Sequence, residues 1–332
     1  MTTWRCAAFA LPELAATLVI VGVAVAMLLV GAGRARLAHN SAASQNQLRW
    51  IAGVTASYAA DHQNRMWALS WKAGVRYPTA DPALSFTESP QQAVANQAID
   101  LMRRRTGRTD IPRITGWVAF LLYSHLPLAD YLDTDLPLLS FVSPADEHRL
   151  KWARDPEAFD LGAFLPFQPD PIESHKRWPY SASYQAAPAL VTYPWSGPGA
   201  VYQSGHDQWL TFADTFFEGL HQQFIAFPSQ KAMVYDWQSS LGASDRYFLD
   251  ERASTSVLCA DGSAELAGTS QSNPGWQPAA PGREAPLRFR YEPRAWEPQA
   301  GAGEYFIGHY RWTRCGAFGR DFGGPELCPP KL

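Results

Sequence analysis

The sequence lacks the motifs that mark the common enzyme classes. Its 332 residues contain no HExxH, no CxxC pair, no GxSxG, no P-loop and no GxGxxG. Each of these motifs places metal ligands, a nucleophile or phosphate-binding backbone at a fixed spacing, so their absence argues against zinc proteases, serine hydrolases and nucleotide-binding enzymes. The eight histidines are scattered along the chain. We therefore expect a protein that is not an enzyme.

A strong charge of either sign is also missing. The chain has 28 Lys and Arg against 31 Asp and Glu, which gives a net charge of -3. A sequence-independent nucleic-acid binder needs a clustered basic surface, so we expect no nucleic-acid partner. Arg103, Arg104 and Arg105 end a predicted helix from Gln91 to Arg105, where positive charge favours the exposed carbonyls of the last turn.

Long hydrophobic runs are scarce, and the single one lies near the N-terminus. Leu14 to Ala32 is a run of 19 residues with no charge and with Thr17 as its one polar side chain. A helix needs about 20 residues to cross the ~30 Å hydrocarbon core of a membrane. The sequence therefore predicts one membrane-spanning segment.

Three interpretations of this run are open. The first is a cleaved secretory signal, with Arg5 as its basic region and Gly31–Gly33 as its small-residue cleavage site. The apolar region of such a signal is about 7–15 residues long, so the run of 19 residues is too long for it. The second interpretation is a plain signal anchor. The third depends on the residues before the run, which read CAAFALPEL.

This N-terminus resembles the precursors of type IV pilins and type II secretion pseudopilins. Those precursors carry a short basic leader, a small residue, then Phe, and a Glu at the fifth mature position. Here the leader is Met1–Ala8 with Arg5, followed by Phe9 and Glu13. The resemblance implies that a prepilin peptidase cleaves between Ala8 and Phe9 and that Phe9 is N-methylated. The family usually has Gly where this chain has Ala8.

Glu13 lies within an otherwise apolar helix. A charged side chain at the bilayer centre costs roughly 2.5–3.5 kcal/mol on insertion scales, so such a residue normally has a functional partner. In the pilin family this partner is the free amine of the first mature residue of a neighbouring subunit. The resemblance thus implies assembly contacts between Glu13 and Phe9 of adjacent copies. The alternative is a Glu that reaches the membrane interface.

We expect an α+β fold in which a long N-terminal helix, first transmembrane and then amphipathic, packs on an antiparallel β-sheet domain with helical and loop insertions, as in pilins. The helix is predicted from Phe9 to about His62, with Asn64 as its terminator, because apolar residues recur at helical spacing beyond the membrane run. The expected divisions are a leader (1–8), a transmembrane half-helix (9–33), a periplasmic half-helix (34–65) and a periplasmic globular domain (66–332).

The resemblance implies a single-pass inner-membrane protein with its C-terminal domain in the periplasm. Counting positive charges alone gives the opposite orientation, since Arg34, Arg36 and Arg49 follow the apolar run and only Arg5 precedes it. Long C-terminal domains translocate largely regardless of charge, which favours the family orientation.

Short strand-like runs follow Pro137. The candidate strands are Leu138–Val142, Ser181–Tyr184, Leu190–Tyr193, Gln223–Phe227, Ala232–Tyr235, Ser256–Ala260 and Ala264–Ala267. Asp261-Gly262 between the last two predicts a hairpin. These last strands are similar to the C-terminal sheet of a pseudopilin-like subfamily, which has His where this chain has Glu251. Ser143 likewise stands where that subfamily usually has Cys. Gly116–Tyr131 is predicted to be partly helical, and Gly268–Gly303 is expected to be a surface loop.

Cysteines and acidic residues give few site candidates. Cys6 would be lost with the leader, and Cys259 lies in a predicted buried strand. A Cys315–Cys328 disulfide is plausible in the oxidising periplasm, and free thiols are the alternative. No cofactor is expected. Calcium, which some pseudopilins hold in a C-terminal loop, would have oxygen ligands in one of two candidate pairs, Asp236 with Asp245 or Asp321 with Glu326.

The chain has 13 Trp, which is more than ordinary usage. Six of them could form a sugar-binding surface, or could serve only aromatic packing: Trp195, Trp209, Trp237, Trp276, Trp296 and Trp312. His206-Asp207 with Asp214 and Glu218 could form an acid–base or metal site, although such residues are more often structural or solvated.

We therefore expect a pilin-like structural subunit whose partners are the prepilin peptidase, other pilin-like subunits and the inner membrane. The alternative is a single-pass membrane-anchored periplasmic binding domain, with carbohydrate as its candidate ligand and no filament role. A third hypothesis, a secreted hydrolase behind a signal peptide, is disfavoured by the missing motifs.

Overall fold

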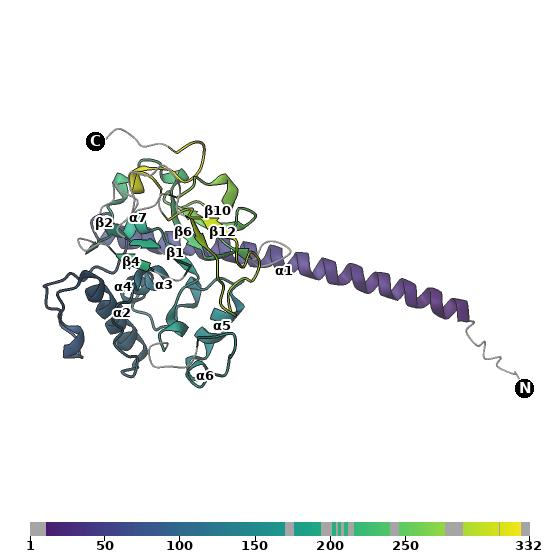
Figure 1. Ribbon diagram of the computed structural model, residues 1–332, viewed down its shortest axis with the longest axis horizontal. Coiled ribbons are helices and arrows are strands. Elements are labelled where there is room, and N and C mark those ends of the chain that lie inside the picture. The colour runs from purple at the N-terminus through teal and green to yellow at the C-terminus, as the bar shows by residue number, and fades with distance from the viewer. Residues whose placement is uncertain are drawn as a thin grey trace, which may run out of the picture.

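A long helix projects from a globular head in the computed structural model (Figure 1). The structure describes residues 11–169, 176–193, 201–203, 205–206, 209–211, 216–239, 246–275, 288–311 and 313–326. The projecting helix, α1, spans Leu11–Asp61 and contains 51 residues. It ends where Gln63 and Asn64 adopt left-handed backbone conformations, with φ of 55° and 61°. The long helix and its terminator agree with the sequence prediction.

The two halves of α1 have different surroundings. Between Leu14 and Val30 the large apolar side chains are 49–71% exposed. This part is long and apolar enough to cross a membrane, and no other helix among the described residues is. Further along, one face of α1 is buried in the head, through Ser44, Leu48, Ile51, Val54, Thr55 and Ala59. The predicted amphipathic second half is therefore confirmed.

A four-stranded antiparallel sheet forms the centre of the head. Its strands are β1 (Tyr184–Ala186), β6 (Ala232–Asp236), β9 (Ser254–Cys259) and β10 (Ala264–Gly268), in the order β1-β6-β9-β10. α1 packs against β9 and β10. Gly262 in the turn between them has a φ of 88°, which a residue with a Cβ rarely adopts. The predicted hairpin is confirmed.

Helices cover the lower part of the head in Figure 1. They are α2 (Pro90–Thr106), α3 (Phe120–Tyr123), α4 (Leu126–Tyr131), α5 (Glu147–Arg154) and α6 (Pro156–Asp160). The hydroxyl of Ser89 caps α2 by accepting the amide hydrogen of Gln92, and Gly107 ends it with a φ of 70°. α2 confirms the helix predicted from Gln91 to Arg105. The second predicted segment, Gly116–Tyr131, contains two short helices, α3 and α4. The three arginines that end α2 form ion pairs with Asp81, Asp100 and Asp130.

Shorter elements connect the rest. Four two-stranded sheets pair β2 (Thr192–Tyr193) with β5 (Phe216–Phe217), β3 (Val201–Gln203) with β4 (Trp209–Thr211), β7 (Gln238–Ser239) with β8 (Arg246–Tyr247), and β11 (Arg288–Arg290) with β12 (Tyr305–Ile307). The single-turn helices are α7 (Pro188–Val191), η1 (Pro82–Leu84), η2 (Leu139–Phe141), η4 (Trp178–Tyr180), η5 (Gln222–Phe224), η6 (Pro228–Gln230), η7 (Thr269–Gln271) and η8 (Gly316–Phe318).

Several predicted strands are wrong. Leu138–Val142 contains the 3-10 turn η2, and Gln223–Phe227 begins inside the 3-10 turn η5. A short apolar run suits a 3-10 turn as well as a strand. Leu190–Tyr193 is half helix, since Pro188 starts α7 with a backbone angle suited to a helix. The strand predicted at Ser181 begins only at Tyr184. The predicted loop after Gly268 contains β11.

The central sheet has two different faces. The hydroxyl of Tyr184 donates to Ser44 Oγ of α1 over 2.8 Å, so Tyr184 faces the helix. Its neighbour Gln185 accepts a hydrogen bond from Arg311 Nη2 over 2.8 Å. Consecutive strand residues point to opposite faces, so Arg311 lies on the side of the sheet away from α1.

Candidate binding pocket

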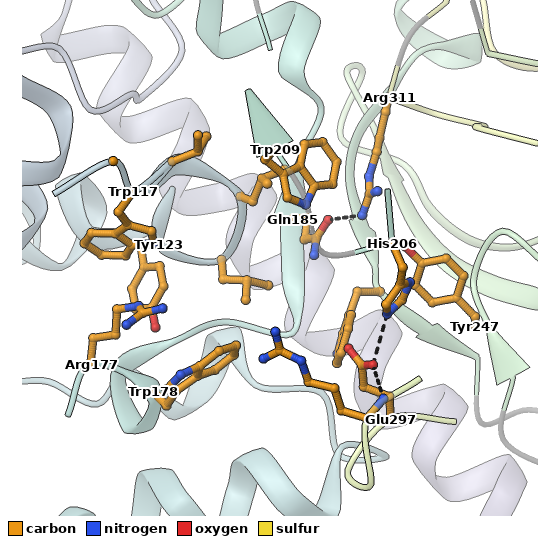
Figure 2. Close-up of a pocket in the computed structure, with 16 residues that line it drawn as sticks. Trp117, Tyr123, Arg177, Trp178, Gln185, His206, Trp209, Tyr247, Glu297 and Arg311 are labelled. Atoms are coloured by element: carbon orange, nitrogen blue, oxygen red, sulfur yellow. Dashed lines mark hydrogen bonds and ion pairs between the residues drawn. The ribbon is translucent and has the colours of Figure 1, made fainter. Parts of the chain in front are cut away.

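A cavity of about 280 Å³ lies on the face of the sheet away from α1 (Figure 2). Six aromatic side chains line it: Trp117, Tyr123, Trp178, Trp209, Trp237 and Tyr247. Five charged or titratable side chains also line it: Arg177, His206, Arg294, Glu297 and Arg311. The lining thus combines aromatic faces with guanidinium groups, and the aliphatic side chains are confined to Val118, Leu121 and Leu122.

One wall comes from the segment before α3 and from the start of η4. Trp117 and Tyr123 meet edge to face with ring centres 4.9 Å apart. The Arg177 guanidinium lies 5.0 Å from the centre of the Trp117 ring and 5.3 Å from that of Trp178. Figure 2 shows Trp117, Tyr123, Arg177 and Trp178 together on one side of the cavity. Arginine–indole contacts of this kind hold both partners in place.

Arg311 forms the centre of the opposite wall. Its exposed fraction is 2%, and its nitrogens donate to the Tyr235 hydroxyl, to Gln203 Oε1 and to Gln185 Oε1 over 3.1, 3.1 and 2.8 Å. The guanidinium also lies 4.5 Å from the centre of the Trp209 ring. These contacts come from β1, β3, β4 and β6, so several strands together fix the position of the Arg311 guanidinium.

His206 and Glu297 form a buried pair beside Arg311. His206 Nε2 lies 3.0 Å from Glu297 Oε2, and the two side chains are 5% and 4% exposed. The same Glu297 oxygen accepts the backbone N–H of Arg294 over 2.7 Å. His206 also meets the Tyr247 ring edge-on at 5.2 Å. This pair anchors the C-terminal loop to the rim of the pocket (Figure 2).

The charge balance of the pocket is positive. Among the described residues, three guanidinium groups and one carboxylate, that of Glu297, line it. Burial lowers the pKa of Arg177, and the positive charge of Arg294 lowers it further, although Tyr123 acts in the opposite direction. Two like charges therefore lie close enough to oppose each other, and an anion between them would relieve that repulsion.

Two neutral donors complete the wall. Burial raises the pKa of Tyr123 to about 12, so its hydroxyl stays protonated at neutral pH. Trp178 Nε1 is buried, and it has no hydrogen-bond acceptor among the described residues. A buried N–H group without an acceptor costs about 1–3 kcal/mol.

The predicted tryptophan surface is only partly recovered. Trp209 and Trp237 line the pocket, and Trp296 packs at its edge with its ring centre 6.3 Å from that of Trp178. Trp195, Trp276 and Trp312 lie outside the described residues. Sequence reasoning missed Trp117, Trp178 and the three arginines. The high Trp count was the only signal for the two tryptophans, and no sequence signal indicated the arginines.

The predicted acid–base cluster is divided between different partners. Glu218 pairs with Arg65 over 2.9 Å, whereas His206 pairs with Glu297. Asp207 and Asp214 lie outside the described residues. The described members therefore have separate structural partners.

The candidate calcium ligands have other contacts. Burial raises the pKa of Asp236 to about 7, which disfavours the charged form that a cation needs. Asp321 lies 3.2 Å from Lys231 Nζ, and Glu326 accepts the Arg314 N–H over 2.6 Å. Asp245 lies outside the described residues. Among the residues the structure describes, no three His, Cys, Asp or Glu side chains gather as a metal site.

The residues predicted for processing, assembly and crosslinking are described only in part. Ala8 and Phe9 lie outside the described residues, and of Glu13 only the backbone, within α1, is described. Cys315 is disulfide-bonded, but Cys328 lies outside the described residues, so the Cys315–Cys328 pairing stays a prediction. Cys259 is a buried free thiol, and burial raises its pKa to about 12, which makes it unreactive.

Comparison with known protein families, with functionally characterised proteins and with solved structures finds no match to this chain.

Proposed function

We propose that this chain is a pilin-like structural subunit, anchored in the inner membrane by α1, with its head in the periplasm. Its role would be assembly into a type II secretion pseudopilus or a type IV pilus-like filament. In this proposal a prepilin peptidase cleaves between Ala8 and Phe9, and Glu13 contacts the Phe9 amine of the neighbouring copy.

The form of α1 is the observation that carries the proposal. One continuous helix of 51 residues has an exposed apolar first part and a second part buried against β9 and β10. At a rise of 1.5 Å per residue it is about 75 Å long, roughly twice the length needed to cross a bilayer core. A plain anchor needs no such continuity between membrane segment and domain core, whereas a subunit that packs through its helix does.

The first test is the mature N-terminus, determined by mass spectrometry of the protein purified from its native membrane. We expect a chain that begins with N-methyl-Phe9. An intact Met1 would instead indicate a plain anchor, and a start after Gly33 would indicate a secretory signal. Either of these two results would contradict the proposal.

The second test is Glu13→Ala, with Glu88→Ala as the matched control because Glu88 is exposed on the head. We expect Glu13→Ala to insert into the membrane normally but to lose chemical crosslinking between differently tagged copies, because the apolar half of the helix loses its carboxylate. The control should crosslink as the parent does. Undiminished crosslinking of Glu13→Ala would contradict the assigned role.

The pocket favours a second candidate, a membrane-anchored binding domain with no filament role. An aromatic and arginine-lined cavity is typical of a ligand site, and packing of helices does not require one. An intact Met1 together with unchanged crosslinking of Glu13→Ala would favour this second candidate.

A further inference from the structure

We infer that the pocket of the head binds an acidic sugar, a single uronate ring whose carboxylate meets the arginines and whose ring stacks on the indoles. This inference goes beyond the proposed function, because the pocket lies in the head and does not depend on processing or assembly of α1. Its failure would therefore leave the proposal for α1 intact.

The arginines select a negative charge. Arg177 and Arg294 line the cavity and oppose each other electrostatically, and Arg311 holds a third guanidinium in the facing wall. A guanidinium presents paired N–H donors that match the two oxygens of a carboxylate. Glu297 is the acidic residue among the described lining residues, and its one negative charge is fewer than the three positive charges of the guanidinium groups.

The indoles select a ring with an apolar face. Trp117 and Trp178 stand on one wall, and Trp209 lies beside Arg311 on the other (Figure 2). Aromatic faces supply a large contact area at little cost in side-chain entropy. A pyranose ring has C–H groups on its faces and hydroxyls around its edge, which fits such a slot.

Polar atoms in the wall suit hydroxyl groups. Gln185 is an amide in the lining, and the guanidinium groups add N–H donors beside it. A lipid chain would offer no charge or hydrogen-bonding group that complements these side chains, which disfavours it. The volume of about 280 Å³ is at the lower end of the range for ligand pockets, so it fits one ring.

The test is isothermal titration of the full-length protein in a detergent without a sugar headgroup. The probes are D-glucuronate, D-galacturonate and oligogalacturonate. D-glucose is the control that lacks the carboxylate, and acetate is the control that lacks the ring. We expect at least one uronate monomer to bind at millimolar concentration or below, and both controls to bind at least about tenfold more weakly. Tighter binding of the oligomer would identify a polymer end as the source of the ring, and equal binding would identify the free sugar acid.

Two variants test the wall. Arg294→Gln removes an exposed guanidinium and should weaken uronate binding by about tenfold or more, since a hydrogen bond to a charged group is worth about 1.5–3 kcal/mol. Its matched control is Arg288→Gln, because Arg288 is exposed on β11 away from the pocket lining. Trp117→Leu should also weaken binding, with Trp50→Leu on α1 as its control.

Thermal unfolding of each variant establishes that the head is folded, and Arg294→Gln and Trp117→Leu provide independent evidence if one of them is unstable. The inference is overturned if no uronate binds, if D-glucose binds as tightly as D-glucuronate, or if the control variants lose as much affinity as the pocket variants. Binding of acetate as tight as that of the uronates would reduce the site to an anion site and would also overturn it.

Discussion

The two halves of α1 belong to one helix with the same backbone conformation, but different forces hold them in place. The first half exposes its apolar side chains, with Leu28 71% exposed, and carries no charge from Leu14 to Ala32. The second half buries Leu48 and Ile51 completely. A helix can therefore be as apolar as a protein core without belonging to one. Stability of the head should depend on the second half alone.

The largest expected effect separates the two halves directly. Ile51→Ala should destabilise the head by about 2–5 kcal/mol, because it leaves a cavity where a fully buried side chain was. Leu28→Ala, a similar truncation in the exposed half, should leave the free energy of unfolding unchanged. Denaturant unfolding in detergent, followed by tryptophan fluorescence, measures both. Equal effects would mean that the halves are not energetically distinct.

The second difference between the regions is charge, since the head buries ionisable groups and the run Leu14–Ala32 of α1 has none. Burial raises the pKa of Asp236 to about 7, with Asp146 acting in the same direction and with Ser143, the Gln238 amide and Arg149 acting against it. From pH 4 to 7 an unfolded chain releases this proton while the folded head keeps it, so Asp236 makes stability fall as pH rises.

Asp236→Asn should remove this loss of stability. The loss amounts to as much as about 4 kcal/mol, because one pKa unit corresponds to about 1.4 kcal/mol. His125 has the opposite effect, because burial lowers its pKa to about 3. The informative quantity is therefore the difference in melting temperature between variant and parent, measured from pH 4 to 8. Asp135→Asn, at an exposed site, is the control. A difference that does not change with pH would contradict the prediction.

A smaller effect tests the polar contacts within the buried half. Thr55 Oγ1 accepts the indole N–H of Trp67 over 2.9 Å, and both residues are buried. Thr55→Val keeps the shape of the side chain but leaves the indole N–H of Trp67 without an acceptor. This should cost about 1–3 kcal/mol of stability. Ser57→Ala removes an exposed hydroxyl two residues further along the helix and should change stability by less than about 0.5 kcal/mol. Similar losses in both variants would show that the Thr55 contact contributes nothing specific.

The sequence predicted those elements whose conformation depends on a few neighbouring residues. The apolar run and helical spacing predicted α1, and Asp261-Gly262 predicted the β9–β10 hairpin, because a positive φ is a property of one residue. Leu138–Val142 failed as a strand prediction, since nothing in five apolar residues distinguishes a strand from a buried 3-10 turn. Its conformation depends on packing against distant residues.

The pocket could not be predicted for the same reason. Trp117, Trp178 and Arg311 are far apart in the sequence and meet only through the folded head. The high Trp count indicated that the aromatic side chains needed an explanation, and a sugar-binding surface was one hypothesis. Of the three chosen tryptophans that the structure describes, Trp209 and Trp237 line the cavity and Trp296 lies at its edge. No spacing rule connects an arginine near the C-terminus with a tryptophan before α3.

The central sheet has a consequence for any assembly through α1. Because Tyr184 faces the helix and Gln185 faces the pocket, copies that associate by their helices would keep the opposite face of each head open. Weak sites repeated along one array then act together, because each binding event raises the effective concentration of a polymer at the neighbouring sites. A filament of such heads would hold a branched polysaccharide with several uronate ends by avidity, even if a single head releases each end readily.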